Sequence, residues 1–427
     1  MSDQTAFGLT TAMNTLVNLT VTENDRVILR DLAQKVAELA ARPIEKTKRE
    51  LWYQHNELHP TRPVIFCDPE NGWNEIIPED ILQCEGGLAR HWEMLLLKEI
   101  FWGASMGDDR VTEPCLDIFY IHHENDWGMH EVKIGGEDGG SYRWNAPLKD
   151  YVDIDKLRFP TLEIDYKTTD QVHSLARDIF SDFLTVRLKG IWWWTLGLTW
   201  TGVNLRGLEQ IMVDMFDYPD GLHRLMAFLR DGHLAKLDFL EKNNLLSLNS
   251  DGTYVGSGGF GYTHELPQPD FDGKQVRPFD MWGFGESQET CYVSPEMFAE
   301  FIFPYQLPLL EKFGLNCYGC CEPLDHRWDV VKNVPRLRRV SVSPWANMEI
   351  MAEKLGRDYV YSLKPNPADI AVSQIDEDYI RKKIREAFRI TKNCRVEIIM
   401  KDNHTIGRNP QNVIRWCKIA REEAGLV

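Results

Sequence analysis

The carboxyl-terminal part of the chain alternates between short apolar runs and longer segments whose apolar residues recur at helical spacing. The apolar runs have the length of buried strands and lie at 315–318, 338–342, 359–363 and 395–400. Helices are predicted at 295–313, 324–331, 350–355, 376–388 and 412–423. Strands that alternate with helices form parallel sheets. Because each strand is followed by polar or reactive residues, the pattern favours a closed barrel over an open sheet, which would bind its ligand at one switch point.

The amino-terminal part is less regular. Thr22 is a good N-cap residue with Asp25 three positions later, so a helix is predicted to begin there. Further predicted elements are helices at 44–57, 89–101, 171–186, 205–215 and 221–243 and strands at 64–67, 115–122, 191–196 and 245–248. We therefore predict an α/β fold, a (βα)8 barrel of the TIM type with an elaborated N-terminal region. Residues 1–150 would form an N-terminal helical extension and the first barrel elements, and residues 151–427 the main (βα)8 barrel with the active site.

Composition narrows the class of protein. The chain has 427 residues, of which 43% are hydrophobic, so it can build a large core. Its net charge of −17 argues against a nucleic-acid or anionic-membrane partner, because such partners require basic patches. The nine cysteines are an odd number and two are adjacent, which is typical of reduced thiols. The sequence shows neither a signal peptide nor an apolar run of membrane-spanning length, so we expect a cytoplasmic protein.

The most reactive stretch is the loop after the predicted strand 315–318. It carries Cys320, Cys321 and Glu322, and loops after barrel strands are where catalytic residues lie. Thiolates suit zinc, so Cys320, Cys321 and His404, which follows the last strand, are candidate zinc ligands. The alternatives are that the two thiols only pack and that His404 bonds to backbone. Cys317 is expected to be a small core residue.

Other strand ends carry candidate catalytic and binding residues. Glu286, Glu322 and Asp402 are candidate proton donors, although Glu286 also fits a turn-capping role. The remaining candidates are substrate-binding residues: Trp193, Asp251, Trp345 and Lys364. Lys364 would bind an anion or a substrate oxygen, and Trp193 would line an aromatic pocket. The alternatives are an exposed lysine and a core tryptophan.

From about Trp192 onward the chain resembles the uroporphyrinogen decarboxylase superfamily, and most of all its corrinoid-dependent methyltransferases. The resemblance rests on the order and spacing of short motifs: 217–220 before a long helix, 294–298, 303–305, 318–323, 343–345 and 364–367. It implies a (βα)8 barrel with zinc at its mouth. The methyltransferases carry His-x-Cys-Gly on a middle strand, whereas this chain reads Asn316-Cys317-Tyr318-Gly319, and the last-strand cysteine is replaced near Asp402. The arginine-rich N-terminal motif of the decarboxylase is absent, which disfavours a tetrapyrrole substrate.

The resemblance implies a methyltransferase that moves a methyl group from a small methylated compound to the cobalt of a corrinoid on a separate carrier protein. The many aromatic residues fit a methoxylated aromatic substrate. Zinc at Cys320 or Cys321 and His404 would polarise the departing oxygen. Without zinc, a carboxyl group would protonate it. The alternatives are a decarboxylase or lyase of a small acid and a non-catalytic ligand-binding barrel. Fold analogy alone predicts a homodimer.

Overall fold

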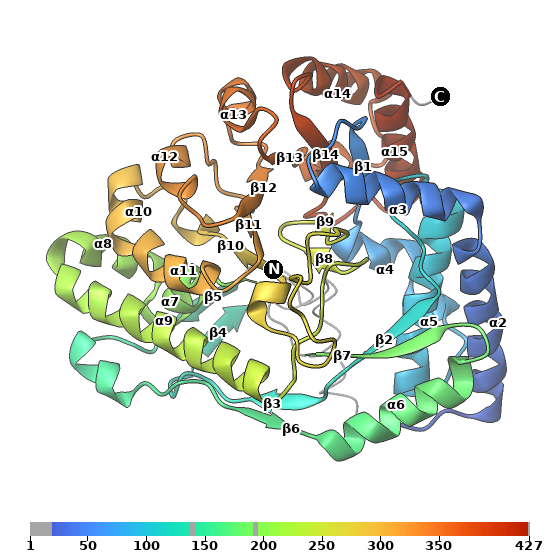
Figure 1. Ribbon diagram of the computed structural model, residues 1–427, viewed down its shortest axis with the longest axis horizontal. Coiled ribbons are helices and arrows are strands. Elements are labelled where there is room, and N and C mark those ends of the chain that lie inside the picture. The colour runs from blue at the N-terminus through green and yellow to red at the C-terminus, as the bar shows by residue number, and fades with distance from the viewer. Residues whose placement is uncertain (1–18, 131, 136–141, 191–194, 426–427) are drawn as a thin grey trace.

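The computed structural model describes residues 19–130, 132–135, 142–190 and 195–425 (Figure 1). Its helices are α2 Glu23–Ala40, α3 Pro43–Asn56, α4 Trp73–Ile76, α5 Gly87–Phe101, α6 Tyr166–Phe180, α7 Thr199–Arg206, α8 Leu208–Asp217, α9 Pro219–Lys242, α10 Pro295–Phe301, α11 Phe303–Leu310, α12 Trp328–Val331, α13 Met348–Leu355, α14 Glu377–Ile390 and α15 Gln411–Glu423. Its strands are β1 Val64–Cys67, β2 Cys115–Phe119, β3 His122–Glu124, β4 Val132–Gly135, β5 Tyr142–Asn145, β6 Leu162–Ile164, β7 Thr185–Lys189, β8 Tyr254–Val255, β9 Gly259–Phe260, β10 Trp282–Gly285, β11 Leu315–Tyr318, β12 Leu337–Val342, β13 Val360–Leu363 and β14 Arg395–Met400.

A six-stranded sheet organises the molecule. Its order is β1-β14-β13-β12-β11-β10, and every neighbouring pair is parallel. The first strand of the chain therefore lies beside the last, with Val64 opposite Glu397 and Cys67 opposite Met400. β2 and β7 form a separate parallel pair, and the other pairs are antiparallel. The predicted α/β class with a parallel sheet is confirmed. Among the described residues, hydrogen bonding does not join β2 and β7 to the larger sheet.

Five strands of the sheet, β1 and β11 to β14, form where the sequence predicts strands, because each is a short apolar run enclosed by helices, whereas β10 was not predicted. The strands themselves are almost entirely buried. The N-terminal helix also begins as predicted: the Thr22 side chain accepts from the backbone N–H of Asp25, and the Asp25 carboxylate accepts from the backbone N–H of Thr22.

Several predicted elements were wrong. The helix predicted at 205–215 is divided at Gly207 between α7 and α8, and the helix predicted at 324–331 begins only at Trp328. The helix predicted at 171–186 ends at Phe180, and Thr185 begins a strand that pairs with β2. Residues 245–248 pair with no strand among the described residues. Instead, the side chain of Asn249 bonds to both backbone polar groups of Trp282, at 2.9 and 3.0 Å. The helix predicted at 295–313 is interrupted between α10 and α11, because Pro304 has no backbone N–H to donate and its ring clashes with the carbonyl group four residues earlier.

The hairpin of β8 and β9 lies between the six-stranded sheet and the β2–β7 pair (Figure 1). Its glycines permit this close packing. A Cβ atom at Gly259 would lie 2.4 Å from the guanidinium carbon of Arg339, and one at Gly256 would lie 2.7 Å from the Cβ of Cys317. On the other side, Lys189 Nζ of β7 lies 3.3 Å from Thr253 Oγ1. The hairpin thus contacts both groups of strands, and its tip brings residues 256–258 towards the loops that follow β11 and β14.

Candidate active site

The loop after β11 places two thiols side by side. Gly319 has φ +91°, a conformation that suits glycine, and it turns the chain immediately after the strand. Cys320 is 1% exposed and Cys321 is half-buried, and their sulfur atoms are 3.7 Å apart. Cys317 is 1% exposed within an apolar cluster, so its predicted role as a core residue is confirmed.

Glu322 holds this loop in place. Its side chain is fully buried, and its Oε1 accepts from the backbone N–H of Ser287 at 2.8 Å. Its Oε2 accepts from the backbone N–H of Cys320 at 2.9 Å. The carboxylate therefore connects the loops that follow β10 and β11. This arrangement gives Glu322 a positioning role, because two fixed backbone donors occupy the oxygens that would transfer a proton.

The end of β14 brings a carboxylate and an amine to the thiols. Asp402 Oδ2 lies 3.7 Å from Cys321 Sγ, and Lys401 Nζ lies 2.6 Å from Asp402 Oδ1. Lys401 also lies 3.5 Å from Glu70 Oε1. Burial raises the pKa of Asp402, but the Lys401 ammonium outweighs burial and brings the pKa below its ordinary value. Asp402 is therefore ionised beside Cys321. Its φ of +61° is strained for an aspartate, and such strain is frequent at functional sites.

Lys364 follows β13 and is 3% exposed. Its Nζ lies 2.5 Å from Ser362 Oγ, and the Ser362 hydroxyl in turn donates to Glu397. Burial lowers the pKa of Lys364 to about 8, although the nearby Glu397 carboxylate opposes this shift. A lysine with such a pKa exchanges its proton near neutral pH, which is the property of a general acid or base.

A buried ion-pair network lies beside Lys364. Arg339 Nε is 2.9 Å from Glu397 Oε1, and His55 Nε2 is 3.2 Å from Glu397 Oε2. Burial alone would raise the pKa of Glu397, but Arg339 and His55 hold it well below its ordinary value. The sequence interpretation missed this network. Its signal was present, because Arg339 and Glu397 each interrupt an apolar strand, and a charge in a buried strand requires a partner.

Ser257 at the tip of the β8–β9 hairpin was also missed. Its hydroxyl donates to Cys320 Sγ at 3.3 Å, and the side chain is 3% exposed. The glycines at 256, 258 and 259 were the available signal, because they allow a backbone to approach its surroundings closely.

Glu286, at the end of β10, is a buried carboxylic acid. Burial, followed by the charges of Glu289 and Glu322, raises its pKa well above the ordinary value. Its Oε2 accepts from the backbone N–H of Gln288 at 2.8 Å, whereas Oε1 has no hydrogen-bond partner in the described part of the chain. Glu286 is fully buried, and its free oxygen faces Gly197, where a Cβ atom would lie 2.6 Å away. The group is a proton donor held in the neutral form.

The other predicted site residues lie apart from this cluster. His404 is exposed, and its Nδ1 lies 3.5 Å from the Asn71 amide. Asp251 pairs with Arg187 at 3.2 Å and Lys189 at 3.1 Å, on the β7 side. Trp345 is 70% exposed. Trp193 and most of the predicted strand 191–196 lie outside the described residues.

The predicted zinc ligands do not gather. Within the described ranges, no group of three or more His, Cys, Asp or Glu side chains has an arrangement that would hold a metal ion. Cys320 and Cys321 contact each other and approach Asp402, but His404 is directed to Asn71. A catalytic zinc site needs three protein ligands, so the residues present do not fit zinc, and we derive no step through it.

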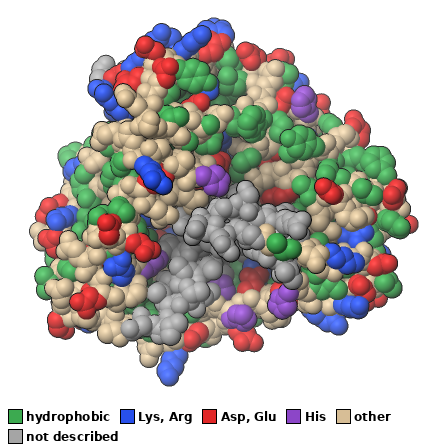
Figure 2. Space-filling view, turned by 180° about the vertical axis from the view of Figure 1, so that it is seen from behind, with side chains coloured by type: hydrophobic (Ala, Val, Ile, Leu, Met, Phe, Trp, Pro, Cys, Tyr) green, Lys and Arg blue, Asp and Glu red, His purple; other side chains and the backbone are tan. Residues whose placement is uncertain are grey.

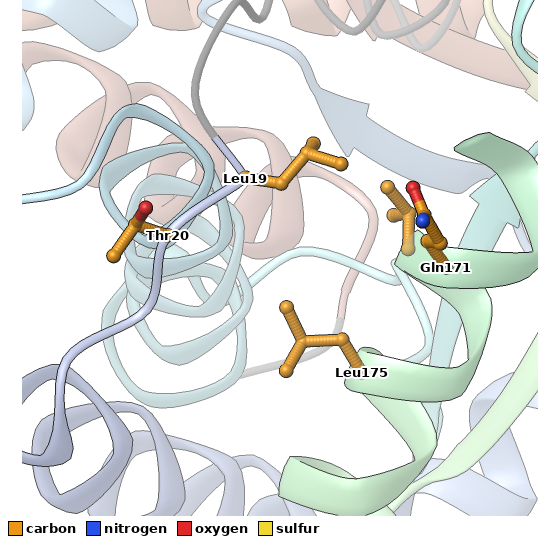
Figure 3. Close-up of a pocket in the computed structure, with 5 residues that line it drawn as sticks. Leu19, Thr20, Gln171 and Leu175 are labelled. Carbon is orange, nitrogen blue, oxygen red and sulfur yellow. The ribbon is translucent and has the colours of Figure 1, made fainter.

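One surface hollow lies outside the cluster. A hollow between the segment before α2 and helix α6 is lined by Leu19, Thr20, Gln171, Val172 and Leu175 (Figure 3). None of these is a predicted site residue.

On the face in Figure 2, acidic and basic side chains are interspersed. Among the described residues, no helix has the length and apolar composition needed to cross a membrane.

Comparison of the sequence with models of protein families and with curated proteins finds no match. The interpretation of the site therefore depends on its own geometry and on the motifs of the sequence.

Proposed function

We propose that this chain is a methyltransferase that moves a methyl group from a small methylated compound, in our hypothesis a methoxylated aromatic, to the cobalt of a corrinoid carried by a partner protein. The observation that carries the proposal is the convergence of Cys321, Asp402 and Lys364 after strands β11, β14 and β13 of one parallel sheet, where a buried amine with a pKa of about 8 lies near the thiols and an ionised carboxylate. The resemblance of residues 192–427 to corrinoid-dependent methyltransferases supports the reaction type.

We also propose that the strands form a closed (βα)8 barrel. The pairing of β1 with β14 brings the two ends of the chain into one sheet, as closure requires. The contacts of the β8–β9 hairpin with both Arg339 and Lys189 support a ring in which β2 and β7 form the opposite wall. In such barrels, catalytic residues lie in the loops at the carboxyl ends of the strands, as Cys321, Lys364 and Asp402 do here.

In this reaction the methyl group leaves oxygen without the electron pair of the C–O bond. The acceptor cobalt supplies the pair that forms the new bond to carbon, and the departing oxygen becomes a phenolate. Catalysis by the chain therefore consists of positioning the donor and stabilising the negative oxygen.

Lys364 is the proton donor in our proposal. A phenol has a pKa near 10, whereas burial lowers the pKa of Lys364 to about 8. Proton transfer from its ammonium to the phenolate is thus favourable by about 3 kcal/mol. General acid catalysis of this kind accelerates reactions about 10²- to 10⁴-fold. Glu286, whose Oε1 has no hydrogen-bond partner among the described residues, is a second neutral donor at the end of β10, and Asp402 holds the Lys401 ammonium.

The test is direct. The chain is incubated with a reduced corrinoid carrier protein and a panel of methoxylated aromatics, and methylation of the corrinoid is followed by its absorbance together with release of the phenol. We expect methylation with at least one donor, and its loss when Lys364 is replaced by methionine. If no donor methylates the corrinoid, or the phenol is released at the same rate without the carrier, the proposal is wrong.

A second candidate, decarboxylation of a small acid, is favoured by one observation. Lys364 and Lys401 are both buried and follow adjacent strands, so they would attract a carboxylate. This reaction would release carbon dioxide without any corrinoid protein, which separates the two candidates in a single experiment.

A further inference from the structure

We propose that Cys320 and Cys321 form a vicinal dithiol that hydroperoxides oxidise reversibly to a disulfide. Three observations carry this inference: the sulfurs contact each other at 3.7 Å, Cys321 is half-exposed, and Cys320 is sealed behind it at 1% exposure. An oxidant can therefore reach the sulfur of Cys321, and the sulfur of Cys320 is already in contact with it. The inference does not depend on the methyltransferase proposal, because it concerns only the chemistry of the two thiols.

The neighbours of the pair suit the reaction. Asp402 Oδ2 lies 3.7 Å from Cys321 Sγ and accepts from its S–H, so the carboxylate can take the thiol proton. Ser257 Oγ donates to Cys320 Sγ at 3.3 Å, and a hydrogen bond of this direction stabilises negative charge on sulfur. The Lys401 ammonium, 2.6 Å from Asp402, adds a positive charge near the carboxylate and the thiol pair.

The electron balance is complete with a hydroperoxide as the oxidant. Cys321 loses its proton to Asp402 and its sulfur attacks the terminal peroxide oxygen. The O–O bond breaks, Cys321 becomes a sulfenic acid, and the departing alkoxide or hydroxide takes the proton back from Asp402 and leaves as an alcohol or water. Cys320 then attacks the sulfenic sulfur. The S–S bond forms, the S–O bond breaks, and the hydroxide leaves as water with the thiol proton of Cys320. Two thiols are oxidised by two electrons and one peroxide is reduced.

Geometry makes this disulfide easy to reduce. Consecutive Cα atoms are about 3.8 Å apart, which is shorter than the roughly 4.4–6.8 Å of ordinary disulfides. The ring formed by Cys320 and Cys321 is therefore strained, and strained disulfides have more oxidising potentials. Closure also removes the S–H that Cys321 directs to Asp402. The thiols of Cys67 and Cys417 also interact, but both residues are fully buried, so this second pair offers no access to an oxidant.

The experiment uses the full chain in its native state. The protein is treated with a small excess of hydrogen peroxide, unreacted thiols are alkylated, and the peptide that contains both Cys320 and Cys321 is examined by mass spectrometry. The tryptic peptide also carries Cys317, so we expect it to lose two hydrogens and to take up a single alkyl group, which fragmentation places on Cys317, and dithiothreitol to restore the other two thiols. Recovery of the peptide with both thiols alkylated, or carrying only oxygen adducts, would overturn the proposal.

A second measurement avoids oxidation altogether. Phenylarsine oxide condenses with two neighbouring thiols and releases one water, so native protein should bind one equivalent. We expect Cys321→Ser to lose at least tenfold in affinity for the arsenical and to lose the two-hydrogen product. Cys417→Ser, the matched control that breaks the buried pair, should keep both. If Cys417→Ser loses arsenical binding and the two-hydrogen product while Cys321→Ser keeps them, the reactive thiols are Cys67 and Cys417, and the inference is refuted.

Discussion

Replacing Lys364 with methionine removes a buried amine and leaves an unbranched side chain of similar length in its place. The amine is 3% exposed and bonds only to Ser362 among the hydrogen bonds of the described residues. If Lys364 donates a proton to the departing oxygen, its loss should reduce turnover by about 10²- to 10⁴-fold. The same substitution should make the protein more stable, which is the opposite of what removal of a structural residue does.

The gain in stability follows from the pKa. Burial lowers the pKa of Lys364 from its ordinary 10.5 to about 8, so the folded state binds its proton less tightly than the unfolded state. The group contributes most stability above pH 10.5 and loses about 3 kcal/mol of it as the pH falls through 8. At pH 7 the methionine variant is free of this cost. It loses the hydrogen bond to Ser362, worth about 1–2 kcal/mol, so we expect a net gain of about 1–2 kcal/mol.

Two assays check these values. Urea unfolding of wild type and of Lys364→Met, from pH 7 to pH 10.5, gives the difference in unfolding free energy. It should fall by about 3 kcal/mol across that range and change sign, so that the variant is the less stable protein near pH 10.5. Methyl transfer measured over the same range should decline in wild type above pH 8, and the residual activity of the variant should not show that decline. Lys354→Met, at an exposed position on α13, is the matched control and should change neither property.

Three results would refute this reasoning. A variant with wild-type turnover would show that Lys364 does not donate the proton. A variant that is less stable at pH 7 would show that burial of the ammonium is fully compensated. A stability difference that stays constant up to pH 10.5 would show that the pKa is not lowered.

Further predictions concern the ion pair, the hairpin and the metal hypothesis. Glu397→Gln should lower the unfolding free energy by about 3–5 kcal/mol at pH 7, because it leaves the charge of Arg339 buried and uncompensated. Folding lowers the pKa of Glu397, so this loss should diminish as acid protonates the wild-type carboxylate below about pH 4.5. Denaturant titrations at several pH values check both expectations. Gly261→Ala should lower the melting temperature, because its Cβ would lie 1.7 Å from a backbone oxygen, whereas Gly202→Ala, on helix α7 with only ordinary contacts, should leave it unchanged or raise it. His404→Ala should keep the rate of methyl transfer within about twofold, since the exposed imidazole contacts none of the clustered groups. Chelators should likewise leave the rate unchanged. A large loss of activity together with loss of bound zinc would restore the zinc hypothesis.

The sequence predicted the strands well where burial imposes one pattern. The runs at 315–318 and 395–400 are apolar and short, and each is enclosed by helices, so local composition and tertiary environment agree. Prediction failed where long-range contacts decide. The helix predicted at 171–186 included Thr185 and Val186, but pairing with β2 makes residues 185–189 a strand in which Arg187 bonds to Asp117. That partner lies about 70 positions away, beyond any local signal.

The candidate site shows the same division. The sequence predicted that Cys320 and Cys321 follow a strand and that Asp402 follows the last strand, and the structure has both arrangements. The sequence did not indicate that Lys401 and Ser257 would complete the group, because Ser257 arrives on a hairpin whose glycines have no periodic pattern.

By itself, the order of apolar runs and helical segments determined the parallel sheet and which residues follow each strand, because the spacing of apolar residues reflects local geometry. Only the tertiary structure decided that Asp402 reaches Cys321, that Lys364 is buried, and that His404 is directed elsewhere. The physical reason is that side-chain direction at a strand end depends on one or two backbone angles, such as the φ of +61° at Asp402. Those angles are set by packing against segments far away in the chain.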